Sequence, residues 1–527
     1  MAERAGAAEA AAGARAAPMR WWGWGEEGRA PGLSAGMLEL LRERVGVSER
    51  PRPPVALANV RLGEPGLTAA TAGRLRGIVG GEHVREDHFD RVVHAAGKGY
   101  PDLVRVRAGE PEGAPDAVLY PGDHEQVRGV LEECVRAGVA VVPFGGGTSV
   151  VGGVAPLRGE HGSVVALDLS RLDALHGLDL ESLIVRVGAG LRVRALERRL
   201  RQRGLTLGHF PQSYEHVAVG GCAATRSAGQ ASTGYGRFED MVLGLRLAAP
   251  AGDLVVRAVP ASAAGPSLRE LVVGSEGTLG VISELELRVR EAPERRAFEG
   301  AFFGDFAAGV AALRVLAQEG SAPAVTRLSD EGETRLSLAA VGSGEGLAGL
   351  KRRLGSLYLG ARGYGSGCLA IFGFEGSDAE IERRRGRVAE VVAAHGGLGV
   401  GSSPGEAWAK QRFSSPYLRD ELLTHGVMVE TLETAVRWSG LTGLHRSVAG
   451  AIEGALNAQG TPGLVMCHVS HVYETGASLY FTVLARQREG REIEQWEAVK
   501  RAAGEAILGG GGGTITHHHA IGRDHVP

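Results

Sequence analysis

The pattern of apolar and polar positions predicts alternating strands and helices in the first half of the chain. Residues 116–122, DAVLYPG, have the apolar run of a strand, and residues 122–138 have the spacing of an amphipathic helix. Residues 139–153, VAVVPFGGGTSVVGG, indicate a short strand that leads into a glycine turn. Residues 240–256 have the pattern of two strands joined by a Gly-Asp turn. Together these elements predict a mixed α+β domain that ends near residue 290.

Two of the predicted helices carry clear end signals. Asp123 stands at the N-cap position of the first, and Gly138 ends it. Residues 368–397 predict a strand followed by a helix that begins with a Ser377-x-x-Glu380 capping box.

The alternation of predicted strands and helices changes after residues 291–296, EAPERR, and we expect a domain boundary there. In the second domain, the run Arg383–Arg385 lies on the helix that begins at the capping box. Such a run favours a solvated helix face, with contact to a lipid surface as the alternative.

The first residues predict a disordered segment followed by an anchor. Residues 1–18 are rich in Ala and Gly and lack an apolar period. Trp21, Trp22 and Trp24 follow directly. Because buried aromatic side chains anchor chain segments, we expect this patch to dock the N-terminal arm on the main body. Direct contact with a ligand is the alternative.

Charge and cysteine content exclude several classes of protein. The 527 residues include 58 basic and 61 acidic ones, a balance without the electrostatic footprint of a nucleic-acid-binding protein. The four cysteines show no CxxC pair and no zinc spacing, so we expect free thiols in a reducing compartment. No apolar stretch is long enough for a membrane span, and the N-terminus is too polar for a signal peptide. The expected location is the cytoplasm.

Glycine turns supply the first candidate chemistry. Gly145, Gly146 and Gly147 follow a strand, and consecutive glycines let backbone N–H groups converge on an anion such as a pyrophosphate. A plain tight turn is the alternative, because 82 of the residues are glycine. The turn is neither a GxGxxG motif nor a Walker loop. Residues 209–242 offer a surface of small residues for a flat ring system, and residues 271–289 hold a second glycine turn.

The order PxGGGTS, VGGxxATRSxG and GSEGTLGVI resembles the FAD domain of the vanillyl-alcohol oxidase and p-cresol methylhydroxylase superfamily. The resemblance implies an α+β fold with a two-subdomain FAD-binding domain of this type and an α/β cap domain that binds substrate. It also implies FAD, with the pyrophosphate on the first turn. Many relatives attach the flavin through a histidine there, whereas this chain has Thr148, so we expect non-covalent FAD. The implied cofactor-binding residues are Pro143, Gly145, Gly146, Gly147, Thr148, Ser149, Pro211, Ser213, Gly220, Gly221, Thr225, Arg226, Ser227, Gly229, Glu276, Gly277, Thr278, Gly280 and Val281.

Further motifs resemble the alkylglycerone-phosphate synthases, from about residue 21 to residue 523. They are WWGWG, SPYLRDELLTHGVMVETLETAV, SLYFTV and THHHAIG. The resemblance implies a redox-neutral exchange of the acyl chain of acyl-dihydroxyacetone phosphate for a fatty alcohol in ether lipid synthesis. It implies lipid substrates, peripheral membrane contact and a homodimer as expectations. The implied segments are a tethering region at 19–111, the FAD domain at 112–291, the cap at 292–460 and a C-terminal active-site region at 461–527.

The same resemblance implies roles for individual residues. Tyr480 in SLYFTV matches the tyrosine that acts as acid and base, with a half-buried structural tyrosine as the alternative. Arg419 in PYLRD matches the arginine that binds the substrate phosphate, with a surface ion pair as the alternative. Arg327 and His209 match further active-site positions. Animal members have a cysteine where this chain has Ser478, which puts the alcohol or chain-length preference in doubt.

The run His517, His518 and His519 has three interpretations. A purification tag would carry more histidines and would end the chain, whereas this run continues as AIGRDHVP. Three adjacent histidines converge poorly on a metal, so no metal is expected. The resemblance implies a loop needed for activity, and the preceding glycine run, LGGGGGT, makes it part of a mobile arm. We favour this third interpretation, in which the imidazoles bind phosphate or move protons.

Two other functions stay open at this point. A related redox enzyme would oxidise a D-2-hydroxy acid and pass electrons to an acceptor, but the GDGNxH-like segment common in such enzymes is absent. A flavin-binding protein without catalysis is the third interpretation, and the retained Tyr480 and Arg419 count against it.

Overall fold

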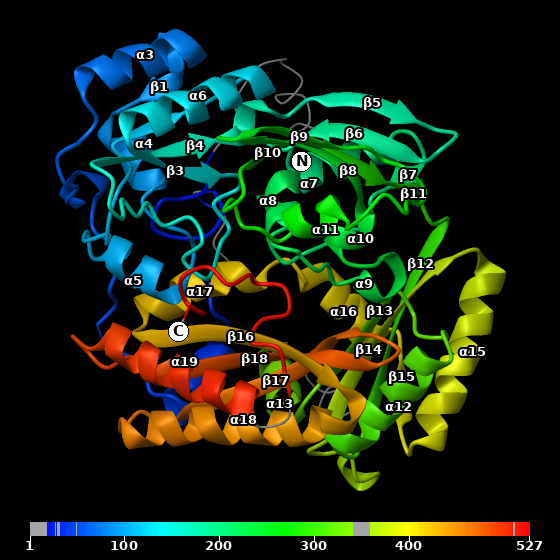
Figure 1. Ribbon diagram of the computed structural model, residues 1–527. Helices are drawn as coiled ribbons and strands as arrows, with labels where there is room; N and C mark the ends of the chain where they lie inside the picture. The colour runs from blue at the N-terminus through cyan, green and yellow to red at the C-terminus, as the bar shows by residue number, and fades with distance from the viewer. Residues whose placement is uncertain are drawn as a thin grey trace.

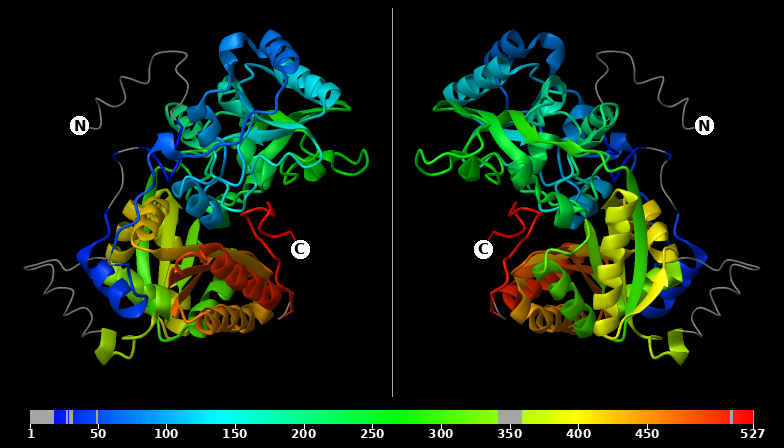
Figure 2. Two further views of the ribbon diagram at one scale, coloured as in Figure 1. Left: turned by 90° about the vertical axis from the view of Figure 1, so that its left-hand side faces the viewer. Right: turned by 90° about the vertical axis from the view of Figure 1, so that its right-hand side faces the viewer.

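The computed structural model describes residues 18–26, 28, 32–48, 50–340, 359–509 and 512–526. The disorder expected for the N-terminal segment falls almost entirely outside these residues. Figure 2 shows two lobes, with the C-terminal arm, drawn in red, running between them. In the described residues, no helix is long and apolar enough to cross a bilayer.

The first lobe contains a mostly parallel sheet that includes the strand predicted at residues 116–122. The strand order is β1-β2-β4-β3, with β2, β4 and β3 parallel and β1 antiparallel at the edge. The strands are β1 (Val84–Arg85), β2 (Ala117–Leu119), β3 (Val139–Phe144) and β4 (Ser163–Asp168). Every side chain of β4 is buried, as expected for a strand covered on both faces.

Helix α6 (His124–Ala137) connects two of these strands, and its ends confirm the sequence signals. The Asp123 carboxylate accepts a hydrogen bond from the Gln126 N–H, and Gly138 closes the helix in the left-handed conformation. The nearby helices of this lobe are α3 (Ala69–Val79), α4 (His88–Val93) and α5 (Tyr100–Arg107).

A second, antiparallel sheet completes the first lobe, in the order β5-β6-β10-β8-β9. Its strands are β5 (Leu175–Asp179), β6 (Ile184–Gly188), β8 (Val242–Ala249), β9 (Gly252–Val256) and β10 (Val281–Arg288). Strands β8 and β9 form the predicted hairpin. The remaining elements are β7 (Leu205–Thr206), β11 (Arg290–Glu291), α7 (Val193–Arg201), α8 (Val219–Ala224), α9 (Ser232–Tyr235), α10 (Phe238–Met241) and α11 (Leu268–Val272). The two glycine turns follow β3 and precede β10.

The second lobe is built on one antiparallel sheet in the order β15-β12-β14-β13-β17-β18-β16. Its strands are β12 (Arg295–Phe303), β13 (Val325–Ser329), β14 (Cys368–Gly376), β15 (Leu398–Gly401), β16 (Val427–Arg437), β17 (Gly463–Val472) and β18 (Gly476–Arg486). The division expected at 460/461 therefore falls within one continuous sheet, because β17 and β18 lie between β13 and β16.

The two faces of this sheet have different neighbours (Figure 1). Leu479 and Phe481 of β18 share a buried core with α18, α19, α12 and α15. Leu484 of β18 and Val429 of β16 pack with α2 on the opposite side. The helices are α2 (Ala35–Arg44), α12 (Phe306–Gln318), α13 (Glu331–Ala340), α15 (Asp378–Ala394), α16 (Ser403–Gln411), α17 (Ser415–Thr424), α18 (Trp438–Ala458) and α19 (Glu492–Gly509).

Helix α15 begins with the predicted capping box. Ser377 accepts from the Glu380 N–H, and the Glu380 carboxylate accepts from the Ser377 N–H. Arg383 on this helix is exposed, as a solvated face requires, whereas Arg385 is paired with Glu299 of β12.

The tryptophan-rich segment docks on α17. The carboxylate of Asp420 accepts from the Trp24 backbone N–H at 2.8 Å and from the Arg20 guanidinium at 2.9 Å. Trp24 packs with Met19 and Tyr417 in a small buried cluster. All four cysteines are free, as expected, and all four are buried.

Candidate active site

A cavity of about 750 Å³ lies between the two lobes, and it is enclosed by both glycine turns, the inner face of the seven-stranded sheet and the C-terminal arm. Of the predicted cofactor-binding residues, Arg226, Gly229 and Thr278 do not line it. The others do: Pro143, Gly145, Gly146, Gly147, Thr148, Ser149, Pro211, Ser213, Gly220, Gly221, Thr225, Ser227, Glu276, Gly277, Gly280 and Val281.

The first glycine turn has the shape and the donors that a pyrophosphate requires. A Cβ on Gly146 would lie 2.1 Å from the carbonyl oxygen of His216, so no side chain fits there. A Cβ on Gly221 would meet nothing within 4 Å, which leaves that side of the wall open. Within the described residues, the N–H groups of Gly146, Gly147 and Thr148 donate no hydrogen bond. These free donors fit the phosphate groups of FAD.

Arg226, a predicted cofactor residue, turns its side chain away from the cavity. Its backbone has a φ of 50°, which is unusual for a residue with a side chain. The guanidinium donates to the carbonyl oxygens of Val273 and Glu270, each at 2.9 Å. The side chain therefore braces the second glycine turn.

Tyr480 of β18 lies in the cavity wall among imidazole rings. The centre of its ring is 4.9 Å from that of His468 in a stacked arrangement, and 5.4 Å from that of His519. Thr482, two residues later, lines the same cavity, as strand alternation predicts. Burial raises the pKa of Tyr480, while Thr431 and Arg419 oppose this rise. The phenol is therefore protonated at neutral pH.

Arg419 of α17 also lines the cavity. Hydrogen bonds through the backbone of Lys98 connect it to the first glycine turn. Its Nη1 donates to the carbonyl oxygen of Lys98 at 2.6 Å, and the Lys98 N–H donates to the carbonyl oxygen of Ser149 at 2.6 Å. The alternative was a surface ion pair with Asp420 or Glu421. Asp420 pairs with Arg20 instead, and no ion pair joins Arg419 to Glu421 in the part of the chain that the structure describes. The rest of the guanidinium can therefore take an anion.

Arg327 belongs to a charged cluster at another part of the wall. Its guanidinium and the Nδ1 of His468 lie 2.8 and 3.0 Å from the same oxygen of Glu333. Burial alone would raise the pKa of Glu333, but Arg327 and His468 hold it well below its usual value. The ionised carboxylate fixes both neighbours in place.

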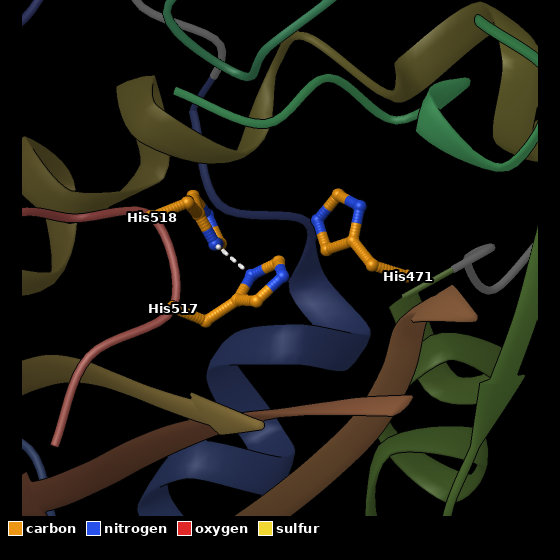
Figure 3. A group of neighbouring side chains, drawn as sticks. All are labelled: His471, His517 and His518. Atoms are coloured by element: carbon orange, nitrogen blue, oxygen red, sulfur yellow. Dashed lines mark hydrogen bonds between the residues drawn. The ribbon is translucent and has the colours of Figure 1, made fainter. Parts of the chain in front are cut away.

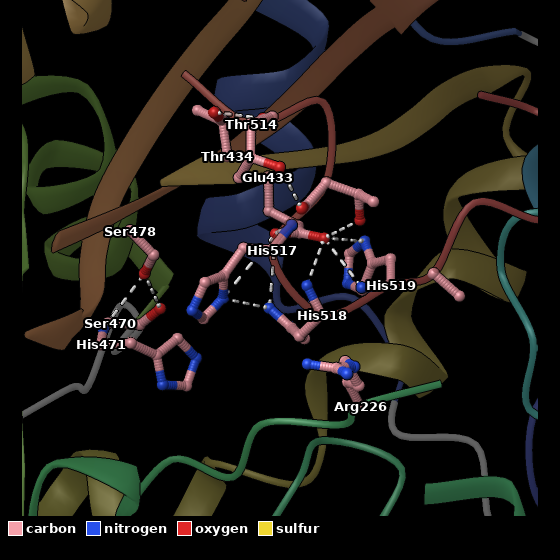
Figure 4. A network of polar contacts seen from close by, with 12 residues as sticks. Arg226, Glu433, Thr434, Ser470, His471, Ser478, Thr514, His517, His518 and His519 are labelled. Atoms are coloured by element: carbon pink, nitrogen blue, oxygen red, sulfur yellow. Dashed lines mark hydrogen bonds and ion pairs between the residues drawn. The ribbon is translucent and has the colours of Figure 1, made fainter. Parts of the chain in front are cut away.

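The histidine arm is anchored by one buried carboxylate, Glu433 of β16 (Figure 4). This carboxylate accepts from the backbone N–H groups of His517, His518 and His519 at 2.6, 2.9 and 2.8 Å. It also accepts from the Thr516 hydroxyl at 2.6 Å. Burial alone would raise the pKa of Glu433, but contact with His518 and the neighbouring imidazoles holds it well below the usual value. Four donors on one carboxylate favour its ionised form in addition.

A second carboxylate holds the arm against the first lobe. Glu276, in the second glycine turn, accepts from the backbone N–H groups of Ile521 and Gly522, each at 2.8 Å. Arg237 donates to the carbonyl oxygen of His517 at 2.8 Å. The arm is thus bonded to both lobes and closes the cavity between them.

The other end of the cavity is apolar. Its wall there comes from α2, α13, α17 and strands β16 to β18, and its residues include Leu33, Met37, Leu336, Leu422, Val429, Met466 and Leu484. A surface of this kind suits a long hydrocarbon chain rather than a small polar substrate.

Comparisons with known proteins identify the family. Residues 115–257 match the FAD binding domain family, and residues 292–527 match the C-terminal domain of FAD linked oxidases. Alkyldihydroxyacetonephosphate synthase of Dictyostelium discoideum is 31% identical over 480 residues, which are 90% of this chain and 78% of that protein.

The chain belongs to the alkyldihydroxyacetonephosphate synthase family. A solved structure of such a synthase superposes with a TM-score of 0.85 at 29% identity and covers 94% of each chain. The fold is shared more widely: p-cresol methylhydroxylase superposes with a TM-score of 0.59 at 15% identity, over 85% of this chain and 89% of that one. These matches confirm the predicted fold class and FAD as the cofactor.

One residue that the synthase resemblance places at the active site lies behind the cavity wall. His209 is 1% exposed, and its Nε2 lies 3.1 Å from the hydroxyl of Ser227, which does line the cavity. Burial lowers the pKa of His209 to about 3, so the ring is neutral. Its catalytic role stays a prediction; the geometry allows action through Ser227.

Two imidazoles of this synthase-family site, those of His468 and His471, were not predicted from the sequence. Residues three apart on a regular strand face opposite sides, yet both line the cavity. The register of β17 against β18 shifts between Val469 and Val472, and this bulge turns both rings inward. Glu433 was not predicted either, because a glutamate within a strand does not indicate a functional role in the sequence until its hydrogen-bond partners are known.

Proposed function

We propose that this protein is a flavin-dependent synthase of ether lipids. Acyl-dihydroxyacetone phosphate and a fatty alcohol give alkyl-dihydroxyacetone phosphate and a fatty acid. The bond between C1 and the ester oxygen breaks, and the fatty acid leaves as a carboxylate. The bond between C1 and the alcohol oxygen forms, and the alcohol releases one proton. The reaction involves no net oxidation. FAD, when bound, supplies an electron-accepting ring that is oxidised at the start and at the end.

One observation carries the proposal: the Tyr480 phenol, the Arg419 guanidinium and an apolar channel, formed by the apolar end of the cavity, meet beside the glycine turns. Only the Nη1 of Arg419 is engaged, by the carbonyl oxygen of Lys98. The Tyr480 hydroxyl is protonated and can give and take a proton. The guanidinium of Arg419 matches the geometry of a phosphate. The apolar channel takes the hydrocarbon chain of the acyl group or of the alcohol. An enzyme for a small hydroxy acid would not need such a channel.

The lipid substrates point to a membrane as their source. Long-chain alcohols and acylated phosphates partition into bilayers because of the large apolar area of their chains. We therefore extend the proposal to transient contact of the protein with a membrane surface in the cytoplasm. The homodimer stays a prediction of the family resemblance.

The test is product formation by the purified FAD-bound protein. Labelled hexadecanol and palmitoyl-dihydroxyacetone phosphate should give a labelled ether and one equivalent of palmitate, with the flavin spectrum oxidised at the end. A variant in which Ala replaces Arg419 should lose activity with the phosphorylated substrate. Absence of any ether, together with bleaching of the flavin by D-2-hydroxy acids, would show that the protein is an oxidoreductase instead.

A further inference from the structure

Three imidazole rings from two separate segments converge beside the cavity (Figure 3). His471 comes from the bulge in β17, and His517 and His518 come from the C-terminal arm. One ring nitrogen of each lies within 4.8 Å of those of the other two. The run of adjacent histidines alone converges poorly on a metal. The ring of His471, supplied from the facing strand, changes that geometry.

Two of the three rings are oriented by hydroxyl groups outside the cluster. The Nδ1 of His471 lies 2.5 Å from the hydroxyl of Ser232, which leaves its Nε2 directed at the other two rings. The Nε2 of His517 lies 2.6 Å from the hydroxyl of Tyr473, which leaves its Nδ1 directed at the Nδ1 of His518. Histidines that bind metals have this arrangement, in which the distal nitrogen is held by an oxygen and the other is free for the ion.

We propose that His471, His517 and His518 bind one divalent transition-metal ion, such as Zn²⁺. Imidazole nitrogen suits zinc and its neighbours in the first transition series. The Nδ1 atoms of His517 and His518 are 3.0 Å apart. Two nitrogens at about 2.0–2.1 Å from a tetrahedral ion lie roughly 3.3 Å apart, so the arm must open by only a few tenths of an ångström.

The surroundings supply charge and an open position. A carboxylate oxygen of Glu433 lies 3.5 Å from the Nδ1 of His518 and adds negative charge beside the ion. His471 and His518 line the cavity, so the fourth position of the ion faces it. Three protein ligands with one open position are the pattern of catalytic rather than structural zinc. An anionic oxygen, such as that of a phosphate, fits this position. Only the binding of a substrate phosphate by the ion rests on the proposed function.

Metal binding can be measured without any turnover. The FAD-bound protein is dialysed against a chelator and titrated with Co²⁺, whose visible bands report tetrahedral nitrogen coordination, and zinc uptake is counted by mass spectrometry. We expect one equivalent of either metal. His471→Ala and His518→Ala should each lower the affinity by about a hundredfold or more, and Ser232→Ala by about tenfold. The matched control is His525→Ala, because this histidine lies on the same arm but outside the cluster.

The flavin spectrum of each variant reports whether the protein is folded. A folded wild-type protein that takes up no metal would overturn the proposal, and so would unchanged affinity in folded His471→Ala and His518→Ala. Inorganic phosphate should alter the Co²⁺ bands, and unaltered bands would overturn the phosphate role alone. Because these readings need no substrate, failure of metal binding and failure of ether synthesis are separate results.

Discussion

At the scale of single residues, the site depends on side chains that fix others in place. Glu433 takes four hydrogen bonds from one short loop, and Glu276 takes two from the residues just after it. Charge-assisted hydrogen bonds of this kind are about twice as strong as neutral ones. The histidines therefore owe their positions to two acidic residues on opposite lobes.

Replacement of Glu433 by Gln should release the histidine arm. The amide cannot accept all of these bonds, so the backbone N–H groups of residues 517–519 should exchange with deuterium much faster. Ether formation should fall by about 10- to 100-fold, because small displacements of catalytic groups are costly. Glu497→Gln, an exposed change on α19, is the control. Unchanged exchange in the first variant would refute the anchoring role.

The anchor also has a pH signature. The folded-state pKa of Glu433 lies below the unfolded value of about 4.3. The ionised Glu433 carboxylate therefore stabilises the folded protein fully above the unfolded-state pKa. This stabilisation is lost as the pH falls through the folded-state pKa. The backbone N–H groups of the arm should therefore stay protected against hydrogen exchange at pH 5 and lose this protection at lower pH. In Glu433→Gln this loss of protection at low pH should be absent, because the amide does not titrate.

Arg419→Lys should raise the apparent KM for acyl-dihydroxyacetone phosphate by roughly tenfold or more and leave the flavin spectrum unchanged. Lysine keeps the charge but cannot form a two-pronged contact with phosphate. Steady-state kinetics with varied phosphorylated substrate measures the effect, and the exposed Arg383→Lys serves as the control. A wild-type KM in Arg419→Lys would remove Arg419 from the phosphate site.

At the scale of elements, the sequence predicted what local patterns determine. Helices α6 and α15 begin where Asp123 and Ser377 place them, because capping is decided within four residues. The glycine turns could be predicted because glycine is needed where the backbone takes a positive φ, as at Gly147 and Gly277, or where a Cβ has no room, as at Gly146. The partnership of His471 with the arm was not predictable, because it depends on a bulge and on contacts across about 46 residues of chain, 471 to 517.

Strand β16 carries a test of the apolar channel. Val429 lines the channel and is 7% exposed, so Val429→Phe should narrow it. The preference for fatty alcohols should shift from hexadecanol towards shorter chains such as decanol, as measured by competition between the two in one assay. Val255→Phe on the exposed side of β9 is the control. An unchanged preference would place the hydrocarbon chain elsewhere.

At the scale of the whole molecule, two lobes are joined over one cavity by the C-terminal arm (Figures 1 and 2). The order of the lobes could be predicted from the change of rhythm near residue 291. The sheet that continues across the expected boundary at 460/461 could not be predicted, because β17 and β18 insert between strands from earlier in the chain. Strand order of this kind is set by long-range pairing that local patterns do not encode.

The first lobe should hold FAD without a covalent bond, because Thr148 stands in the turn where many relatives have a histidine. Acid precipitation should therefore move the yellow colour into the supernatant. Absorbance of the washed pellet, redissolved in denaturant, provides the check. Colour that stays with the pellet would mean that another residue of this lobe is bonded to the flavin.

The most direct test of the account is ether formation by Tyr480→Phe, followed with labelled hexadecanol while the flavin spectrum is recorded. The control is Tyr364→Phe, whose hydroxyl donates to the carbonyl oxygen of Gly396 at the surface. We expect bound, oxidised FAD in both variants and a loss of about 10²- to 10⁴-fold in rate for Tyr480→Phe alone. A wild-type rate of ether formation in Tyr480→Phe would contradict the claim that Tyr480 carries out the proton transfer of the exchange in this cavity.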